Sequence, residues 1–163
     1  MAQDTGLPWA MPSPNMPTAD TALVYPGACL LEGTNLSEGR GTTRPFETFG
    51  APWLDGFRLA DELNERRLPG VLFRPIQFQP TFQKHGGELC EGCFVHVFDR
   101  AAFRSVDTYV EVLRVTWRQS DGLMQWKLPP YEYELEKMPI DILWGGPDLR
   151  ESIGSERPVR LRG

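Results

Sequence analysis

Glycine and proline recur along the whole chain and leave few stretches in which a long helix can form. The sequence holds 16 glycines and 15 prolines, together about 19% of its 163 residues, against roughly 12% in average proteins. Inside a helix, each glycine costs about 1 kcal/mol and each proline about 3 kcal/mol relative to alanine. A helix bundle is therefore not expected, and short elements joined by many turns are.

Length and charge narrow the class of protein further. A chain of 163 residues suits one domain that folds without a disulfide or a metal. The net charge is −5 and no basic stripe is present, which argues against nucleic acid as a partner. The longest apolar stretch, residues 22–31, is interrupted by Pro26 and Gly27. It is too short to cross a bilayer, so no membrane insertion is expected.

Hydrophobic periodicity predicts a single mixed α+β domain with a small sheet and two main helices. Apolar residues at helical spacing place the main helices over 54–67 and 106–117. Alternation predicts strands over 71–82 and 93–98, the first at an edge or with a bulge because it contains prolines. The remaining helical elements are expected over 19–24, ending at Pro26–Gly27, and as short turns over 140–144 and 148–153. Extended segments are expected over 45–53, 123–127 and 131–136. A strand or turn is expected over 29–33, and a loop or edge strand over 35–43.

Both ends of the chain differ from this central part. Residues 1–20 contain four prolines, which favour extended backbone and predict a semi-rigid strap. The strap also carries several apolar side chains, too many for a solvated linker: Leu7, Trp9, Met11 and Met16. We expect them to pack against another surface, which can lie outside this chain. Residues 154–163 show no periodicity and predict a flexible tail, so residues 21–153 form the domain.

Three cysteines leave several interpretations open. Cys90 and Cys93 could bind zinc together with His85 and His96, but alternation along a strand places Cys93 and His96 on opposite faces. A redox C-x-x-C normally opens a helix, whereas this one leads into a strand. We favour small, partly buried thiols, with a Cys29–Cys90 bridge as the alternative in an oxidising compartment. No metal or cofactor is expected.

The residues best suited to bind a ligand are concentrated in one glycine-rich segment. They are Glu32, Asn35, Ser37, Glu38, Arg40, Thr42, Thr43 and Arg44. Arginine offers a planar fork for a carboxylate, amides and hydroxyls suit sugars, and two glutamates suggest an acid/base pair. On a strand, Glu32, Glu38 and Arg40 would share one face. The alternative is a solvated loop with local ion pairs.

His96 is a separate candidate. It lies between Phe94 and Phe98 on one face of the expected strand. A histidine among apolar neighbours is more often a hydrogen-bonded core residue than a catalytic base. Arg74 and Arg100 are as well suited to structural ion pairs as to ligand contacts.

Five segments together resemble a bacterial family that was first described as of unknown function and is now associated with exo-β-N-acetylmuramidases. Those enzymes remove terminal N-acetylmuramic acid from peptidoglycan fragments. The segments are Pro-Ser-Pro-Asn-Met-Pro-Thr (12–18), Tyr-Pro-Gly-Ala-Cys-Leu-Leu-Glu-Gly-Thr-Asn (25–35), Ser-Glu-Gly-Arg-Gly-Thr-Thr-Arg-Pro-Phe-Glu (37–47), Phe-Arg-Pro-x-x-Phe-x-Pro-Thr-Phe (73–82) and Val-His-Val-x-Asp-Arg (95–100). The similarity runs from about residue 7 to about residue 153 and is most specific in the first half.

The resemblance implies a two-domain protein with its active site in the cleft between a Rossmann-like N-terminal domain and a smaller α+β domain. This chain is similar only to the second domain and the strap that joins the two. The catalytic glutamate usually proposed for the family belongs to the first domain, so the resemblance implies no catalytic residue here and no activity in isolation. The positions that carry over as substrate contacts are Asn15, Glu32, Asn35, Ser37, Glu38, Arg40 and His96.

The implied ligand is a glycan that contains N-acetylmuramic acid. Muramic acid differs from glucosamine by a lactyl carboxylate, and an arginine such as Arg40 would be its natural partner. The first residues, Met1–Asp4, lack the basic and apolar regions of a signal peptide; full-length relatives are often exported, so the resemblance places such a signal upstream. The alternative function is a stand-alone, non-catalytic module that binds cell-wall glycan.

Overall fold

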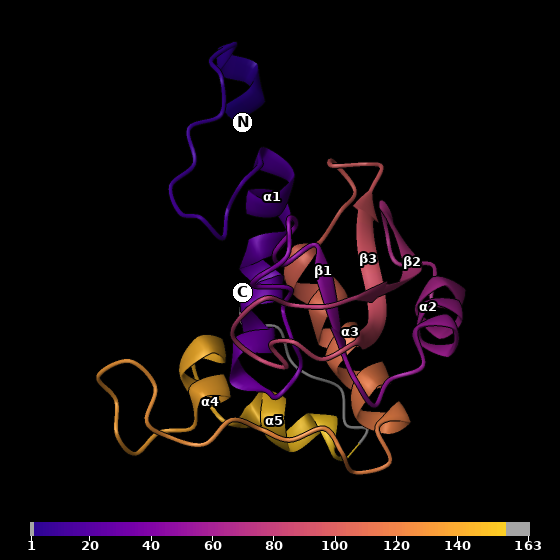
Figure 1. The fold of residues 1–163 in the computed structure, drawn as a ribbon, viewed down its shortest axis with the longest axis vertical. Coiled ribbons are helices and arrows are strands. Elements are labelled where there is room, and N and C mark those ends of the chain that lie inside the picture. Colours follow the sequence, from indigo (N-terminus) through magenta and orange to yellow (C-terminus); the bar gives the residue numbers. More distant parts are fainter. Residues whose placement is uncertain (1, 156–163) are drawn as a thin grey trace.

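The computed structural model describes residues 2–155 and shows a three-stranded antiparallel sheet packed against helices (Figure 1). The strands are β1 (Thr48–Ala51), β2 (Val71–Phe78) and β3 (Cys90–Val97), in the order β1-β3-β2. This confirms the predicted α+β domain with a small sheet. It also confirms that the proline-containing strand β2 lies at an edge, where a missing N–H costs no ladder bond.

The two main helices are where the periodicity predicts them, and they build the core with the sheet. They are α2 (Gly56–Glu65) and α3 (Ser105–Gln119), which contact each other, while α2 also contacts β2 and β3. From the sheet, the ring of Phe49 meets the ring of Tyr109 of α3 at a centroid distance of 6.2 Å. The buried Tyr109 hydroxyl donates to the carbonyl oxygen of Phe46 at 2.6 Å. The loop before β1 is thereby fixed to the core.

The helix that follows the strap is longer than predicted. Thr18 caps it, and its hydroxyl oxygen accepts the N–H of Thr21 at 3.2 Å. However, α1 (Ala19–Ala28) continues through Pro26 and Gly27 and passes directly into the 3-10 helix η2 (Cys29–Gly33). Two expectations were therefore wrong: that Pro26–Gly27 ends the helix, and that a strand or a simple turn follows it.

Tertiary contacts with α3 explain why this helix continues. The Ser105 hydroxyl accepts the N–H of Gly27 at 2.8 Å and donates to the carbonyl oxygen of Val24 at 2.7 Å. A Cβ on Gly27 would lie 2.1 Å from the Ser105 carbonyl oxygen, so only glycine permits this close packing. Contacts between α1 and α3 thus outweigh the local tendency of proline to stop a helix.

The segments after α3 contain little regular structure until two short helices. The predicted extended segments 123–127 and 131–136 form only isolated bridges, Thr34 with Trp126 and Tyr131 with Glu134. The predicted helical turns are confirmed as α4 (Pro139–Trp144) and α5 (Asp148–Ile153). None of the helices in the described part of the chain is long and apolar enough to cross a membrane.

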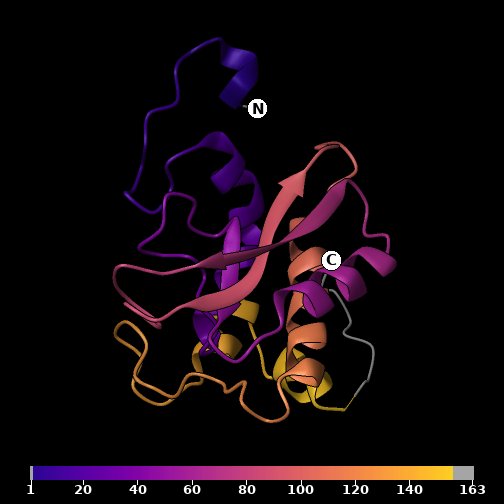
Figure 2. The ribbon, with the colours of Figure 1, turned by 45° about the vertical axis from the view of Figure 1, so that its right-hand side comes forward.

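The strap arches away from the domain (Figure 2). Its first residues form a short 3-10 helix, η1 (Ala2–Thr5), which the sequence did not predict. The Trp9 indole N–H donates to the carbonyl oxygen of Met16 at 3.2 Å, while Leu7 and Met11 are 74% and 64% exposed. Packing of the strap on a surface outside the chain stays a prediction, and most of the predicted tail, residues 156–163, lies outside the described residues.

Candidate functional site

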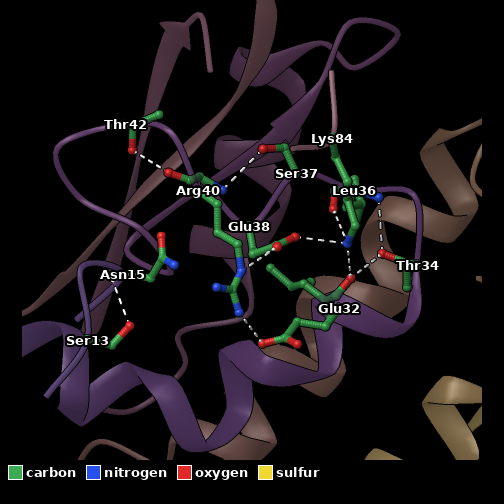
Figure 3. Close-up of polar contacts among 12 residues, drawn as sticks. Ser13, Asn15, Glu32, Thr34, Leu36, Ser37, Glu38, Arg40, Thr42 and Lys84 are labelled. Carbon is green, nitrogen blue, oxygen red and sulfur yellow. Dashed lines mark hydrogen bonds and ion pairs between the residues drawn. The ribbon is translucent and has the colours of Figure 1, made fainter. Parts of the chain in front are cut away.

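Glu32, Glu38 and Arg40 meet around one guanidinium group (Figure 3). Glu32 lies in η2, and the other two lie in the loop that follows it. Arg40 donates from Nη2 to Glu32 Oε1 and from Nε to Glu38 Oε1, both at 3.0 Å. Its guanidinium also lies 5.1 Å above the ring of Phe46. The three side chains therefore converge as a strand would have placed them, but on a helical turn and a loop.

Two residues that sequence reasoning missed complete this group, which we call the glutamate cluster: Glu32, Glu38, Arg40, Lys84 and Tyr131. Lys84 Nζ donates to Glu38 Oε2 at 2.8 Å, and Tyr131 Oη donates to Glu32 Oε2 at 2.9 Å. These partners are 46 and 99 residues away in the chain. No local pattern around Lys84 or Tyr131 could have indicated these contacts.

In the cluster, two carboxylates (Glu32 and Glu38) form ion pairs with two cations (Arg40 and Lys84), and all four side chains are at least partly buried. The Glu38 side chain is 4% exposed and that of Arg40 is 23% exposed. Burial would lower the pKa of Arg40, but the charges of Glu32 and Glu38 outweigh burial and raise it. Burial lowers the pKa of Lys84, against the opposing effect of Glu38. Burial and the hydrogen bond to Glu32 raise the pKa of Tyr131, so its hydroxyl remains a donor.

In this arrangement both carboxylates pair with one cation. In glycosidases the two carboxyl groups flank the scissile bond, whereas here Glu32 and Glu38 accept hydrogen bonds from the same guanidinium. Arg40 therefore lies between the two carboxylates and pairs with both. Within residues 2–155, Arg40 Nη1 has no hydrogen-bond partner, unlike Nε and Nη2 of the same guanidinium.

Asn35 and Ser37 are turned toward backbone groups. The Asn35 side chain donates to the carbonyl oxygen of Leu123 and accepts the N–H of Gln125, both at 2.9 Å. The Ser37 hydroxyl oxygen accepts the N–H of Gly39 at 3.2 Å. These two residues shape the loops around the cluster.

Asn15 lies in the strap and is partly exposed. Its backbone N–H donates to the Ser13 hydroxyl at 3.2 Å. Its side-chain amide makes no hydrogen bond within the part of the chain that the structure describes. The amide is therefore free to contact a ligand, unlike the amide of Asn35.

His96 is located away from the cluster, on the outer face of the sheet. Its Nε2 accepts the Nε–H of Arg74 at 3.2 Å, and its ring centroid lies 4.7 Å from that of Phe94. Partial burial and the charge of Arg74 lower the pKa of His96, against the effect of Glu47. The expectation of a core histidine was wrong, because His96 is exposed. The shared face with Phe94 was right.

The cysteines are free thiols in this structure. Cys90 and Cys93 are buried at β3, and Cys29 is partly exposed at η2. Among residues 2–155, no three His, Cys, Asp or Glu side chains are grouped so that they could hold a metal ion, which removes the zinc interpretation. The structure thus matches the interpretation of separate, small thiols rather than that of a Cys29–Cys90 bridge.

Thiol titration should find three slowly reacting groups. Burial raises the pKa of Cys90 to about 11 and that of Cys93 to about 12; burial and then the charge of Glu32 raise that of Cys29 to about 11. Since the thiolate is the reactive form, alkylation at pH 8 should be slow in the folded protein and rapid after unfolding in urea. Recovery of only one thiol from unreduced, unfolded protein would instead demonstrate a bridge.

Comparison with known proteins identifies the family. The family described as "Exo-beta-N-acetylmuramidase NamZ, C-terminal" matches residues 23–161. The chain belongs to this family. A curated relative, the peptidoglycan beta-N-acetylmuramidase NamZ of Bacillus subtilis (strain 168), is 52% identical over 111 residues, which are 68% of this chain and 27% of that protein. The resemblance found in the sequence is thereby confirmed.

Two solved structures have the same fold over most of this chain. A DUF1343 family protein from Bacteroides fragilis NCTC 9343 superposes with a TM-score of 0.78 at 27% identity, over 94% of this chain and 39% of that one. A second DUF1343 family protein of the same organism gives a TM-score of 0.55 at 20% identity, over 91% of this chain and 36% of that one, which supports the fold alone. The chain thus spans about a quarter of the curated relative and under two fifths of these structures.

Proposed function

We propose that this chain is the substrate-cleft domain of a peptidoglycan-degrading exo-β-N-acetylmuramidase and that it does not hydrolyse glycan on its own. Its family membership supports the relation to a muramidase. Its coverage of the relatives supports the role of one part of a larger enzyme, because most of the relative lies outside the matched region. Its partners would be a glycan containing N-acetylmuramic acid and a Rossmann-like N-terminal domain.

One observation carries the proposal that the chain binds without catalysing: Arg40 lies between the two glutamates of the cluster. The pair of carboxylates that could have supplied an acid and a base is occupied by a cation. What the cluster offers outward is Arg40 Nη1, a charged donor suited to sugar oxygens or a carboxylate. Asn15 in the strap supplies a second donor without a described partner. Hydrolysis then requires groups from the N-terminal domain.

The proposal is tested with a chromogenic muramide and the N-terminal region of the Bacillus subtilis relative. The chain alone should show no turnover above buffer. Joined to that region in one polypeptide, it should raise turnover at least about a hundredfold over either part, because the reacting groups are then held in register. The N-terminal region fused to an unrelated domain is the control. Robust turnover by the chain alone would contradict the proposal.

A stand-alone glycan-binding module is the second candidate. One observation favours it: the glutamate cluster is complete within this chain, with all four charged groups supplied by it. This module would bind muramyl fragments saturably, and fusion to the N-terminal region would add no turnover. The same assay therefore separates the two functions.

A further inference from the structure

A cavity of about 440 Å³ lies on the outer face of the sheet, apart from the glutamate cluster. Arg74 of β2 and Phe94 and His96 of β3 line one side of it, and Arg44 and Glu47 of the loop before β1 line another. No residue of the cluster lines this cavity. The cavity therefore brings two arginines, two carboxylates (Glu47 and Asp20 of α1) and aromatic rings together at a place with no role so far.

We propose that this cavity binds the carboxylate group of a muramyl ligand and that Arg74 is the residue that holds it. The proposal rests on the proposed function, since it takes the ligand class from there. It differs from the sequence-based expectation, which assigned the lactyl carboxylate to Arg40.

Contacts with His96 and Phe94 hold the guanidinium of Arg74 in place and leave its two terminal nitrogens without a partner among the described residues. Its Nε donates to His96 Nε2 at 3.2 Å, and its central carbon lies 5.5 Å above the ring of Phe94. Arg74 and Phe94 are direct cross-strand partners, so the contact follows from the register. The two terminal nitrogens make no hydrogen bond or ion pair within residues 2–155. A pre-oriented fork with two open donors is suited to bidentate binding of a carboxylate.

The charge of Arg74 is also uncompensated, because the carboxylates that line the cavity have other partners. Glu47 accepts the Thr21 hydroxyl at 2.6 Å and Arg44 Nη1 at 3.2 Å. Asp20 forms its ion pair with Arg100. An anionic ligand would therefore meet one cation without a carboxylate partner, close to a second cation that already has one.

The aromatic side of the cavity suits the rest of such a ligand. The Phe94 ring and the exposed Phe98 ring, 74% accessible, offer apolar surface for a sugar face or the lactyl methyl group. The lowered pKa of His96 keeps its imidazole neutral at pH 7, so that it accepts from Arg74 instead of repelling it. Arg74 would thus bind the acid group of one small ligand, while Phe94 and Phe98 would contact its apolar parts in the same cavity.

Arg40 is less suited to the same task. Two of its nitrogens already donate to Glu32 and Glu38. A carboxylate that approached its remaining nitrogen would meet a guanidinium whose charge is already paired with two carboxylates, whereas Arg74 has no carboxylate partner among the described residues. Geometry and charge therefore favour Arg74 for the acid group and leave Arg40 to neutral sugar oxygens.

The proposal is tested by titrating the isotopically labelled chain with N-acetylmuramic acid and N-acetylglucosamine and following amide shifts by NMR. Arg74→Gln should weaken N-acetylmuramic acid binding about tenfold, the size expected for one charge-assisted contact, and leave N-acetylglucosamine binding unchanged. Arg58→Gln, an exposed arginine of α2, is the matched control. Muramyl dipeptide distinguishes two carboxylates, because its lactyl carboxylate is converted to an amide and its peptide carries another carboxylate. If Arg74→Gln weakens binding of N-acetylmuramic acid, Arg74 binds the lactyl carboxylate. If Arg74→Gln weakens binding of the dipeptide alone, Arg74 binds the peptide carboxylate.

The outcomes separate the two proposals. If both sugars bind and Arg74→Gln changes neither affinity, the inference about the cavity is wrong while the proposed function stands. If Arg40→Lys selectively weakens N-acetylmuramic acid binding and Arg74→Gln does not, the carboxylate belongs to the cluster. If neither sugar nor the dipeptide shifts any amide, the binding role in the proposed function fails together with this inference.

Discussion

Arg40→Met should lower the free energy of unfolding by about 3 kcal/mol, because it leaves two partly buried carboxylates without their shared cation. Glu38 is affected most, since its side chain is 4% exposed and would retain only Lys84 as a charged partner. Glu32 would retain the Tyr131 hydroxyl. Methionine keeps an unbranched apolar side chain but loses the guanidinium that lies above the Phe46 ring, so the loss reports the charged group more than the side-chain volume.

Urea denaturation followed by circular dichroism measures this change. Arg58→Met is the control, because an exposed substitution of this kind normally changes stability by less than about 0.5 kcal/mol. Adding Glu32→Gln and Glu38→Gln to Arg40→Met should recover much of the loss, since the carboxylates that lack a cation are then neutral. A loss below about 1 kcal/mol for Arg40→Met alone would show that Lys84 and Tyr131 suffice to hold both glutamates.

Gly92→Ala should prevent the sheet from forming as it does now. A Cβ on Gly92 would lie 2.0 Å from the carbonyl oxygen of Phe49 and 2.6 Å from the Cα of Gly50. Gly92 faces Gly50 in the β1–β3 register, and both clashing atoms belong to the backbone, so no side chain can move aside. We expect a loss of more than about 4 kcal/mol, at the extreme of single substitutions.

The control is Gly154→Ala, because a Cβ there meets nothing within 4 Å. Thermal melts and amide spectra of the two variants should separate a destabilised protein from an unchanged one. If Gly92→Ala unfolds cooperatively within about 1 kcal/mol of the wild type, β1 and β3 can separate enough to admit a methyl group, and the close approach at Gly92 is not required.

The parts of the fold that local chemistry determines were predictable from the sequence. The helices α2 and α3 follow from apolar residues at helical spacing, and β2 follows from alternation, with Pro75 indicating its edge position. The course of α1 was not predictable, because its passage through Pro26 depends on Ser105 of α3, a residue 81 positions from Val24. A prediction from neighbouring residues in the sequence cannot include a contact between residues so far apart in the chain.

The same division applies to the candidate site. The segment from Glu32 to Arg44 was identified by its composition, and it does supply three members of the cluster. Composition could not show that Asn35 is turned to the backbone of Leu123, nor that Arg74 and His96 meet across two strands. Those facts depend on register and loop closure, which the sequence pattern does not determine.

The hydrogen bond from Tyr131 to Glu32 joins two segments 99 residues apart. Asn35 adds three further hydrogen bonds to the segment around Leu123 and Gln125, two through its side chain and one through its backbone N–H. Under the proposed function, the loops that face the glycan also hold the early and late parts of the domain together, so ligand affinity and domain stability would be coupled at the cluster. The Arg74 side chain carries no such tie, since its one hydrogen bond among the described residues is to His96 on the neighbouring strand. If the cavity on the outer face of the sheet binds the carboxylate as proposed, substitution of Arg74 would change its ligand preference without breaking a contact between the early and late parts of the domain.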